Sequence, residues 1–460
     1  EHFCQEEIRL NRRFAPQLYL EVVNIGGTAE HPVIGGTPII DYLVKMQRFS
    51  RHDELDTLLL QEQLTPEIIE QFAEYLAISH QQAPKIDPRC YFGCLDSISA
   101  PVAENFQQTS LLLSESVQQQ LMELKEWSQS RFDKLHDLIV RRKERGFIRE
   151  CHGDVHLANM LWHNSQPLLF DCIEFNDNFR CIDIVNDYAF LLMDLDDRSA
   201  EALSWRFLNR YLQLTGDYDG LNLLIYYKSY RALVRAKVTC LRLQQSGLNK
   251  TERENDINLV QSYLDLASRY SQSRKTALMI SHGFSGSGKS TFIRQLAPLL
   301  GAVSIHSDIE RKRLQGLSET AQSRSTVDGG IYTAQTNLQT YNRLHGLAET
   351  VLQAGFPVLI DATFLKQLQR EQMQQLANRL EVPFLILDFP LDESELFRRM
   401  EQRSKLAGQI SEATIAVLEK QLVQAQPLTR TEEQVCIKIQ PDSTAETIAI
   451  LLDRFISTGC

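Results

Sequence analysis

The sequence predicts two domains of different fold class, an α+β domain over residues 1–270 and an α/β domain over residues 271–460. A chain of 460 residues is too long for one ordinary hydrophobic core. Strand-like segments near its start give way to long helical segments, whereas strands and helices alternate in its last part. The stretch "RYSQSRKT", residues 269–276, is polar and lacks a core pattern, so it marks the boundary.

The composition is that of a globular protein. Hydrophobic residues make up 43% of the chain and charged residues 23%, with a net charge of −11. An acidic chain is poorly suited to bind nucleic acid through its overall charge, although a local basic patch could still do so. No bilayer-spanning apolar run or signal peptide is visible, so we expect a cytoplasmic protein without a membrane partner. Nine cysteines without a repeated spacing indicate reduced thiols.

The N-terminal domain is expected to open with a helix and a small sheet. Residues 3–14 have helical spacing, and residues 18–27 are typical of a strand that ends in a glycine turn. Residues 32–49 are interpreted as a hairpin with Gly35 and Gly36 at its bend. Because the sequence begins at Glu1 and inside a helix, we expect a natural N-terminal part to precede it. Helical segments are predicted at 54–63, 66–82, 111–145 and 199–270.

The stretch "HGDVHLAN" contains His152, Asp154 and Asn159 at the spacing of a kinase catalytic loop. In such a loop the Asp takes the proton of the attacking hydroxyl and the Asn holds Mg²⁺. In "LLFDCIEF", Asp171 ends an apolar stretch at the place where a kinase has its second Mg²⁺ ligand. Further on, Asp183 could brace the catalytic loop.

These motifs resemble those of the aminoglycoside phosphotransferase and choline-kinase branch of the kinase-like fold. The resemblance implies that Asp154 is the catalytic base and that Asn159 and Asp171 are Mg²⁺ ligands. Kinases of this fold also need a glycine-rich loop over the phosphates and a strand Lys paired with a helix Glu.

The position of that Lys leaves two interpretations open. In the first, Glu6 or Glu7 of the opening helix is the paired carboxylate, and the Lys strand lies upstream of Glu1. In the second, Lys45 in "YLVKMQRF" is the required Lys. We favour the first, under which the domain would bind nucleotide poorly or not at all in the sequence as it stands.

The C-terminal domain alternates strands with helices. An amphipathic helix with Leu344, Leu347 and Val351 on one face ends at Gly355, a residue suited to the end of a helix. The predicted strands are "ALMIS", "AVSIH", "PVLID", "FLILDF" and "VCIKI". Helical crossovers between them predict a five-stranded parallel sheet covered on both faces.

The stretch "GFSGSGKST", residues 283–291, matches the phosphate-binding P-loop pattern G-x-x-x-x-G-K-[ST]. Its glycines let backbone N–H groups turn toward phosphate oxygens, and the following helix presents its N-terminus to the anion. Lys289 would reach the β- and γ-phosphates, and Ser290 would coordinate Mg²⁺. The residues predicted to bind the nucleotide, ATP or GTP, are Gly283, Ser285, Gly286, Ser287, Gly288, Lys289, Ser290 and Thr291.

Further candidate residues follow at the carboxyl ends of the next strands, where ligands bind in open α/β folds. Asp308 could accept the proton of the acceptor hydroxyl, or it could simply cap a charged helix. Arg311 could hold an anionic substrate or the transferring phosphoryl group, and Asp361 stands where a Mg²⁺ carboxylate belongs. Arg399 and Arg403 could close over the γ-phosphate as part of a lid, or they belong to a solvated charge run.

This half resembles the small P-loop kinases of the zeta-toxin, polynucleotide-kinase and gluconate-kinase group, through "GFSGSGKST", "SDIERKRL", "VLIDATF" and the lid arginines. In that group the Asp of the "SD" motif, here Asp308, is the base or a substrate anchor. The two halves in this order resemble a bacterial family of aminoglycoside phosphotransferase-like proteins fused to a P-loop ATPase or kinase. The resemblance implies an ATP- and Mg²⁺-dependent kinase that phosphorylates a hydroxyl of a small metabolite, sugar or nucleotide-sugar.

The acceptor and the oligomeric state stay open at this point, and so do other functions. The N-terminal domain is either a second kinase or a degenerate substrate-binding partner. A nucleotide-gated regulatory ATPase would bind or hydrolyse ATP without a metabolite acceptor. A polynucleotide 5′-end kinase would use the basic side chains of "RALVRAKVTCLRL", residues 231–243, as a nucleic-acid contact.

Overall fold

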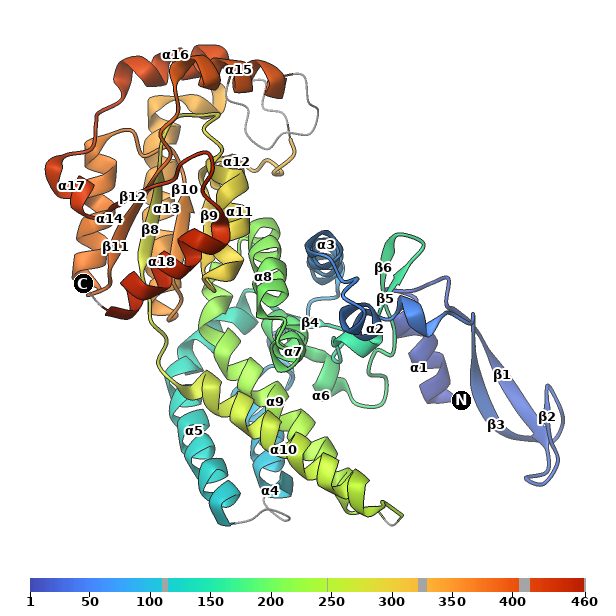
Figure 1. The fold of residues 1–460 in the computed structure, drawn as a ribbon. Coiled ribbons are helices and arrows are strands. Elements are labelled where there is room, and N and C mark those ends of the chain that lie inside the picture. Colours follow the sequence, from blue (N-terminus) through green and yellow to red (C-terminus); the bar gives the residue numbers. More distant parts are fainter. Residues whose placement is uncertain (110–114, 246, 322–328, 405–413, 459–460) are drawn as a thin grey trace. The chain divides into compact units, whose positions relative to one another are not determined.

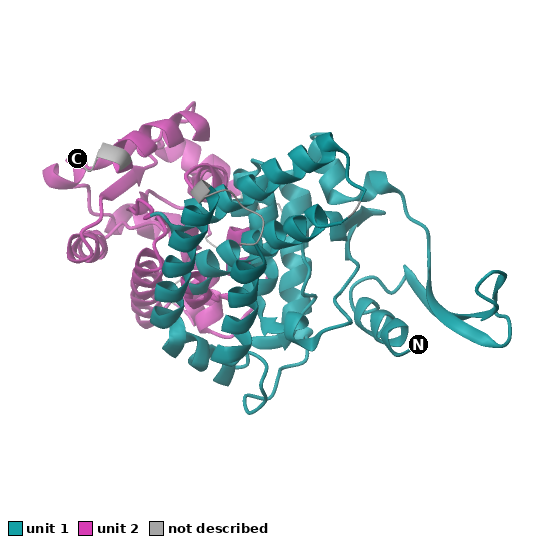
Figure 2. Ribbon diagram, turned by 90° about the horizontal axis from the view of Figure 1, so that it is seen from below, with its two compact units in different colours: residues 1–207, 223–272 teal, residues 208–222, 273–460 magenta. Residues whose placement is uncertain are grey.

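The computed structural model describes residues 1–109, 115–245, 247–321, 329–404 and 414–458. The chain divides into two compact units (Figure 2). The predicted order, an α+β domain followed by an α/β domain with a five-stranded parallel sheet, is confirmed. Unit 1 comprises Glu1–Phe207 and Leu223–Gln272, and unit 2 comprises Leu208–Asn222 and Ser273–Cys460.

Unit 1 contains short sheets and long helices (Figure 1). Its strands are β1 (Tyr19–Gly27), β2 (Pro32–Ile34), β3 (Ile39–Met46), β4 (Ile148–Glu150), β5 (Met160–His163), β6 (Gln166–Leu169) and β7 (Cys181–Asp183). Its helices are α1 (His2–Asn11), α2 (Leu55–Leu60), α3 (Pro66–Gln82), α4 (Leu95–Thr109), α5 (Glu115–Glu144), α6 (Asp177–Arg180), α7 (Ile184–Asp197), α9 (Leu221–Leu243) and α10 (Lys250–Ser271). The division between the units falls within α8 (Glu201–Thr215) and at the start of α9.

The N-terminal sheet differs from the hairpin that the sequence predicted. Strands β2 and β3 do not pair with each other, because both pair with β1 in the order β2-β1-β3. A Cβ on Gly26 would lie 2.0 Å from the backbone of Gly36. Only glycine therefore lets the connection after β2 pass so close to the end of β1.

The helical part of unit 1 surrounds α7, in which every residue from Ile184 to Asp196 is buried. A helix that is buried on all sides needs neighbours on all sides, and α10 and β7 are among them. Because α7 is held so firmly, it can position the polar side chains that it carries. Among the helices that the structure describes, none combines the length and apolarity needed to cross a bilayer.

Unit 2 is a parallel sheet with helices on both faces (Figure 1). All five predicted strands form, in the order β12-β11-β8-β10-β9. They are β8 (Leu278–His282), β9 (Val303–His306), β10 (Val358–Asp361), β11 (Phe384–Asp388) and β12 (Cys436–Lys438). The helices are α11 (Lys289–Leu299), α12 (Ser307–Leu314), α13 (Ala334–Gln353), α14 (Gln367–Arg379), α15 (Glu393–Ser404), α16 (Ile415–Gln424), α17 (Arg430–Gln434) and α18 (Ala445–Thr458).

Apolar layers hold this sheet in place. Met279, Leu359 and Leu385 of the central strands form a buried cluster with side chains of α11 and α18 on one face. Helices α13 and α14 contact the strands and each other on the opposite side (Figure 1). Because all strands are parallel, their carboxyl ends meet at one edge of the sheet, where the P-loop begins.

The segment Leu208–Asn222, which the sequence analysis placed in the first domain, packs with unit 2. Asn209 Nδ2 donates to the carbonyl of Ala302 at 3.0 Å, and Asn209 Oδ1 accepts from the N–H of Ser304 at 2.7 Å. These bonds give hydrogen-bond partners to backbone groups at the exposed edge of β9, the outermost strand. Arg210 adds two bonds to Glu319, at 2.9 and 2.6 Å. A single side chain thus substitutes for a neighbouring strand.

Candidate active sites

The first candidate site lies on the loop between β4 and β5 in unit 1. Asn159 Nδ2 donates to Asp154 Oδ2 at 2.9 Å and to the Asp154 carbonyl at 3.1 Å. Asp171 follows β6 with a φ of +62°, a conformation that is rare outside glycine, and its N–H donates to the Tyr19 hydroxyl at 3.0 Å. The structure therefore brings together the three residues that the sequence selected, Asp154, Asn159 and Asp171.

The brace of this loop is Asp187, one turn beyond the Asp183 that the sequence suggested. Asp187 is fully buried, and its carboxylate accepts the N–H groups of Gly153 at 2.7 Å and His152 at 3.2 Å. His80 contacts the same carboxylate at 3.0 Å. Asp183 instead pairs with Arg142 and caps the start of α7. Two charge-assisted bonds to consecutive backbone amides fix the loop just before Asp154.

The two carboxylates of the site differ in their protonation behaviour. Burial disfavours ionisation of Asp154, but the hydrogen bond and charge of His156 and the charge of Arg231 prevail and lower its pKa to about 2. For Asp171, burial and the charge of Asp154 raise the pKa above its ordinary value. Two acidic side chains that repel each other, together with an amide oxygen, form a donor set that suits Mg²⁺.

His152 supports the loop as a neutral imidazole. Its Nε2 bonds the carbonyl of Phe170 at 2.9 Å, and its Nδ1 accepts from the N–H of Asp154 at 3.3 Å. This pattern assigns the ring proton to Nε2. Burial disfavours the imidazolium and lowers the His152 pKa to about 4.

We expect the free energy of unfolding to fall between pH 6.5 and pH 4 because of His152. The unfolded state, with a pKa near 6.5, binds a proton in this window that the folded state does not, so stability is lost on acidification, by about 3 kcal/mol. In His152→Gln this slope should flatten, as measured by urea unfolding across pH. The exposed control His31→Gln should keep the parent slope. An unchanged slope in His152→Gln would contradict the assignment.

Helix α1 occupies the side of the site next to Asp171. Burial raises the pKa of Glu7, and so do the charges of Glu174 and Asp171, which places the Glu7 carboxylate near the candidate Mg²⁺ ligands. Lys45, the alternative considered from sequence, pairs with the exposed Glu21 of β1 at 2.7 Å. The choice between the two sequence interpretations stays a prediction.

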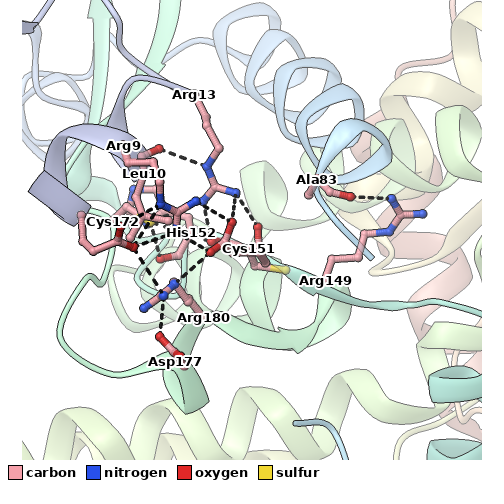
Figure 3. Close-up of polar contacts among 12 residues, drawn as sticks. Arg9, Leu10, Arg13, Ala83, Arg149, Cys151, His152, Cys172, Asp177 and Arg180 are labelled. Carbon is pink, nitrogen blue, oxygen red and sulfur yellow. Dashed lines mark hydrogen bonds and ion pairs between the residues drawn. The ribbon is translucent and has the colours of Figure 1, made fainter. Parts of the chain in front are cut away.

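Arginines tie α1 to the strand that leads into the loop (Figure 3). Arg9 donates to the Glu150 carboxylate at 2.8 Å, and Arg180 contacts the same carboxylate from α6. Arg13, just after α1, donates to the backbone carbonyls of Glu150 at 2.8 Å and Cys151 at 3.2 Å. Since Cys151 directly precedes His152, any shift of α1 would be transmitted to the loop.

The second candidate site is the P-loop between β8 and α11 in unit 2. Gly283, Gly286 and Gly288 all have positive φ, at 139°, 88° and 92°, as a loop that curls around an anion requires. Lys289 Nζ donates to the carbonyls of Gly283 at 3.0 Å and Phe284 at 2.6 Å. Ser287, Ser290 and Thr291 lie at the loop's end and in the first turn of α11, and Ser285 precedes them.

Asp361 faces the P-loop from the end of the neighbouring strand β10. His306, its register partner on β9, contacts it with Nδ1 at 2.9 Å. Burial opposes ionisation, but His306, the Ser290 hydroxyl and the charge of Lys289 together lower the Asp361 pKa. The predicted pair Ser290 and Asp361 is therefore adjacent in space, which is the arrangement that a P-loop Mg²⁺ site needs.

Asp308 and Arg311 lie on α12, directly after β9. They form an ion pair with an Nη1–Oδ1 distance of 2.5 Å, so Arg311 already holds an anionic group. Arg311 also contacts Asn337 of α13 and lies over the ring of Tyr332. Asp308 lies in the first turn of α12, but the N-cap residue of this helix is His306, so the interpretation of Asp308 as the cap is wrong and its role as a base stays a prediction.

The lid arginines are only partly described. A Cβ placed on Gly288 would lie 3.5 Å from Arg399 Nη1, so this guanidinium is next to the P-loop. Arg399 Nε also bonds Glu395 at 2.7 Å. The side chain of Arg403 lies outside the described residues. Helices α15 and α16 pack on Phe284 of the P-loop through a small apolar cluster, which includes Leu396, Met400 and Leu418.

Family matches cover most of both units. Residues 4–224 match the phosphotransferase enzyme family, and residues 278–428 match an AAA domain. Unit 1 is therefore similar to the phosphotransferase enzyme family, and unit 2 is a P-loop domain similar to AAA domains, in the order that the sequence resemblance implied. Unit 1 is the phosphotransferase domain, and unit 2 is the P-loop kinase domain. The protein is accordingly a kinase, and its acceptor is unknown.

Relatives of the fused kinase occur in mycobacteria. Three uncharacterized proteins, two from Mycobacterium tuberculosis and one from Mycobacterium bovis, are 29% identical over 388 residues, which is 83% of this chain and 73% of each relative. Similar solved structures include a gluconokinase from Sinorhizobium meliloti, with 18% identity, TM-score 0.27, and coverage of 40% of this chain and 92% of that chain. The APS kinase of M. tuberculosis has 18% identity, TM-score 0.29, and coverage of 40% and 99%.

Sequence reasoning missed several residues of the P-loop kinase domain. His306 had a usable signal, since it ends a strand and directly precedes the "SD" motif. Gln421 of α16 had none, although its side chain accepts from the N–H of Ser285 and donates to its hydroxyl, both at 3.0 Å. Tyr341 of α13 bonds Thr363 at 3.3 Å, beside Asp308 and Arg311. These contacts join segments that are far apart in sequence.

Proposed function

We propose that the P-loop kinase domain transfers the γ-phosphoryl group of ATP, with Mg²⁺, to a hydroxyl of a small metabolite, sugar or nucleotide-sugar. One observation supports this proposal most directly. Three neighbouring strands, β8, β10 and β9, end in the P-loop, in Asp361 and in the Asp308 helix. A phosphate cradle, a metal carboxylate and a candidate base thereby share one edge of the sheet.

Each side chain has a distinct part in this proposal. Lys289 and the P-loop amides bind the β- and γ-phosphates, while Ser290 and Asp361 hold Mg²⁺. Asp308 accepts the proton of the acceptor hydroxyl as its oxygen attacks phosphorus and ADP leaves. Arg311 holds Asp308 in place, and Arg399 approaches the phosphoryl group from the lid helix α15. Arg403 is assigned to the same lid by its place in the sequence.

The phosphotransferase domain is proposed to act as a second kinase-like or substrate-binding domain. Asp154 is its candidate base, and Asn159 and Asp171 are its candidate Mg²⁺ ligands. The bond between Asn159 and Asp154, and the repulsion between Asp154 and Asp171, support a cation position among them. The basic stretch 231–243 gives little support to nucleic-acid binding, because Arg231 is buried and Arg242 pairs with Asp256.

Asp308→Asn tests the chemical step. With labelled ATP and a metabolite extract, we expect the variant to form the phosphorylated product about 10²-fold more slowly, because the amide cannot accept the proton. ATP affinity should stay within a few-fold of the parent, since Asp308 lies on α12 and not on the P-loop. The matched control Asp442→Asn changes an exposed carboxylate and should behave as the parent.

The same assay separates the regulatory alternative. A nucleotide-gated regulator would hydrolyse ATP without any acceptor and would tolerate Asp308→Asn. Product formation at the parent rate in Asp308→Asn would overturn the role of this residue. ATP hydrolysis that no metabolite fraction stimulates would overturn the kinase proposal for this domain.

A further inference from the structure

A small cavity in the phosphotransferase domain lies beside the Asp154 loop, and none of the roles assigned above involves it. Its volume is about 30 Å³, two to three times the roughly 10–15 Å³ that one water needs, so it admits a small group such as a carboxylate and not a whole sugar. Helices α4, α6, α7 and α9 and strand β7 enclose it. Its polar lining includes Ser97, Asn178, Asp183, Asn186, Tyr230 and Arg231.

Arg231 of α9 supplies a positive charge to this cavity, and the other charged residue of the lining, Asp183, is paired with Arg142. Its side chain is buried, with 5% of the residue exposed, and its Nε donates to the carbonyl and the Oδ1 of Asn186 at 3.2 and 2.8 Å. The rings of Phe190 and Tyr230 flank the guanidinium. Within the described part of the chain, no carboxylate forms an ion pair with Arg231. The charge of Asp154 acts on this guanidinium without a direct ion pair, so an anion bound in the cavity would add a direct, charge-assisted contact.

A second polar group of the lining lacks a partner. Asn178 Oδ1 is buried and accepts no hydrogen bond from the described residues. Unsatisfied buried acceptors are uncommon in folded proteins, so we expect a hydroxyl or a water in the cavity to donate to this oxygen. The guanidinium of Arg231 can donate to an anionic group, and the amide of Asn178 can accept from a hydroxyl. Together they suit a ligand that carries both an anion and a hydroxyl.

The backbone of Phe179 brings this cavity close to the catalytic loop. Phe179 lines the cavity, and a Cβ added to Gly153 would lie 2.6 Å from the Phe179 carbonyl oxygen. Asn186, which holds Arg231, is followed by Asp187, which holds the loop. The positive charge of Arg231 also stabilises the ionised carboxylate of Asp154. A ligand anchored in the cavity would therefore lie next to the candidate base.

We propose that this cavity binds the anionic group of a hydroxylated acceptor, a carboxylate or a phosphate, through Arg231. The inference rests on the proposal that the phosphotransferase domain holds a phosphoryl acceptor. Its consequence is a substrate class, namely hydroxy acids or sugar phosphates. A polycationic amino sugar would meet the Arg231 guanidinium as a like charge and would be rejected.

Binding of small anions to the full chain tests this assignment without any need for turnover. The Lys289→Ala background removes phosphate binding at the P-loop, and sodium chloride keeps the ionic strength constant. Inorganic phosphate and acetate are the two probes, read out by the concentration dependence of the melting temperature. We expect at least one probe to bind, and Arg231→Gln to weaken it about tenfold or more. Acetate alone would identify a carboxylate site, and phosphate alone a phosphoryl site.

Two variants keep the test decisive. Arg242→Gln removes an exposed guanidinium from the same helix α9 and should bind the probe as the background does. Ser97→Phe fills the cavity without changing any charge, and it should abolish binding even if Arg231→Gln fails to fold. The assignment is overturned if neither probe binds the Lys289→Ala chain, or if Ser97→Phe binds as strongly as the background. A failure of the P-loop kinase assay would leave these results unaffected.

Discussion

Lys289→Ala is expected to slow phosphoryl transfer by the P-loop kinase domain about 10²- to 10³-fold, the usual cost of removing one preorganised charge from a reacting phosphoryl group. The Lys289 ammonium is buried at the P-loop, where its contacts to the Gly283 and Phe284 carbonyls hold it in position. A bound triphosphate offers stronger, charged acceptors at the same place. Initial rates with labelled ATP, together with the dissociation constant for ATP, measure the loss.

Two further variants are needed to interpret the result for Lys289→Ala. Lys438→Ala removes an exposed lysine from strand β12 and controls for the change in net charge. Asp154→Asn, alone and combined with Lys289→Ala, separates the two domains, since both are candidates to use ATP. If Lys289→Ala leaves product formation undiminished while Asp154→Asn abolishes it, the chemistry belongs to the phosphotransferase domain and our assignment is wrong.

The P-loop could be predicted because everything it needs is contiguous: a strand, three glycines, Lys289 and a helix. The same holds for the five parallel strands, each of which is an apolar run with a turn or helix on either side. By contrast, the contact between His306 and Asp361 depends on the register of β9 with β10. Register is set by packing across the whole sheet. The sequence therefore predicts where each strand ends, but it does not predict that His306 and Asp361 pair with each other.

Long-range packing also explains where the sequence interpretation failed. Asp183 and Asp187 lie one turn apart on the same apolar stretch, and only the approach of the loop to α7 decides which one braces it. Asn209 satisfies an edge strand that lies 93 residues further along the chain. The assumed hairpin failed because Gly26 admits the backbone after β2, a contact that no local pattern encodes.

Arg142→Ala is expected to destabilise the phosphotransferase domain by about 3–5 kcal/mol. Arg142 Nε and Nη2 bond the two carboxylate oxygens of Asp183 at 2.8 and 3.0 Å, and both side chains are almost completely buried, with 0% and 2% exposed. The guanidinium also lies over the ring of Phe147 at 4.0 Å. Its removal leaves a buried carboxylate without a counter-ion at the start of α7, the helix that carries the Asp187 brace. Urea unfolding of the full chain measures the loss.

A double variant distinguishes the ion pair from simple packing. In Arg142→Met with Asp183→Asn no charge is left buried, the Met fills much of the vacated volume, and the Asn can still cap α7 through the N–H of Val185. We therefore expect the double variant to recover most of the stability that Arg142→Ala loses. The exposed neighbour Arg145→Ala should cost less than about 1 kcal/mol. If the double variant is as unstable as Arg142→Ala, the loss comes from packing against Phe147 and the uncompensated charge is not its cause.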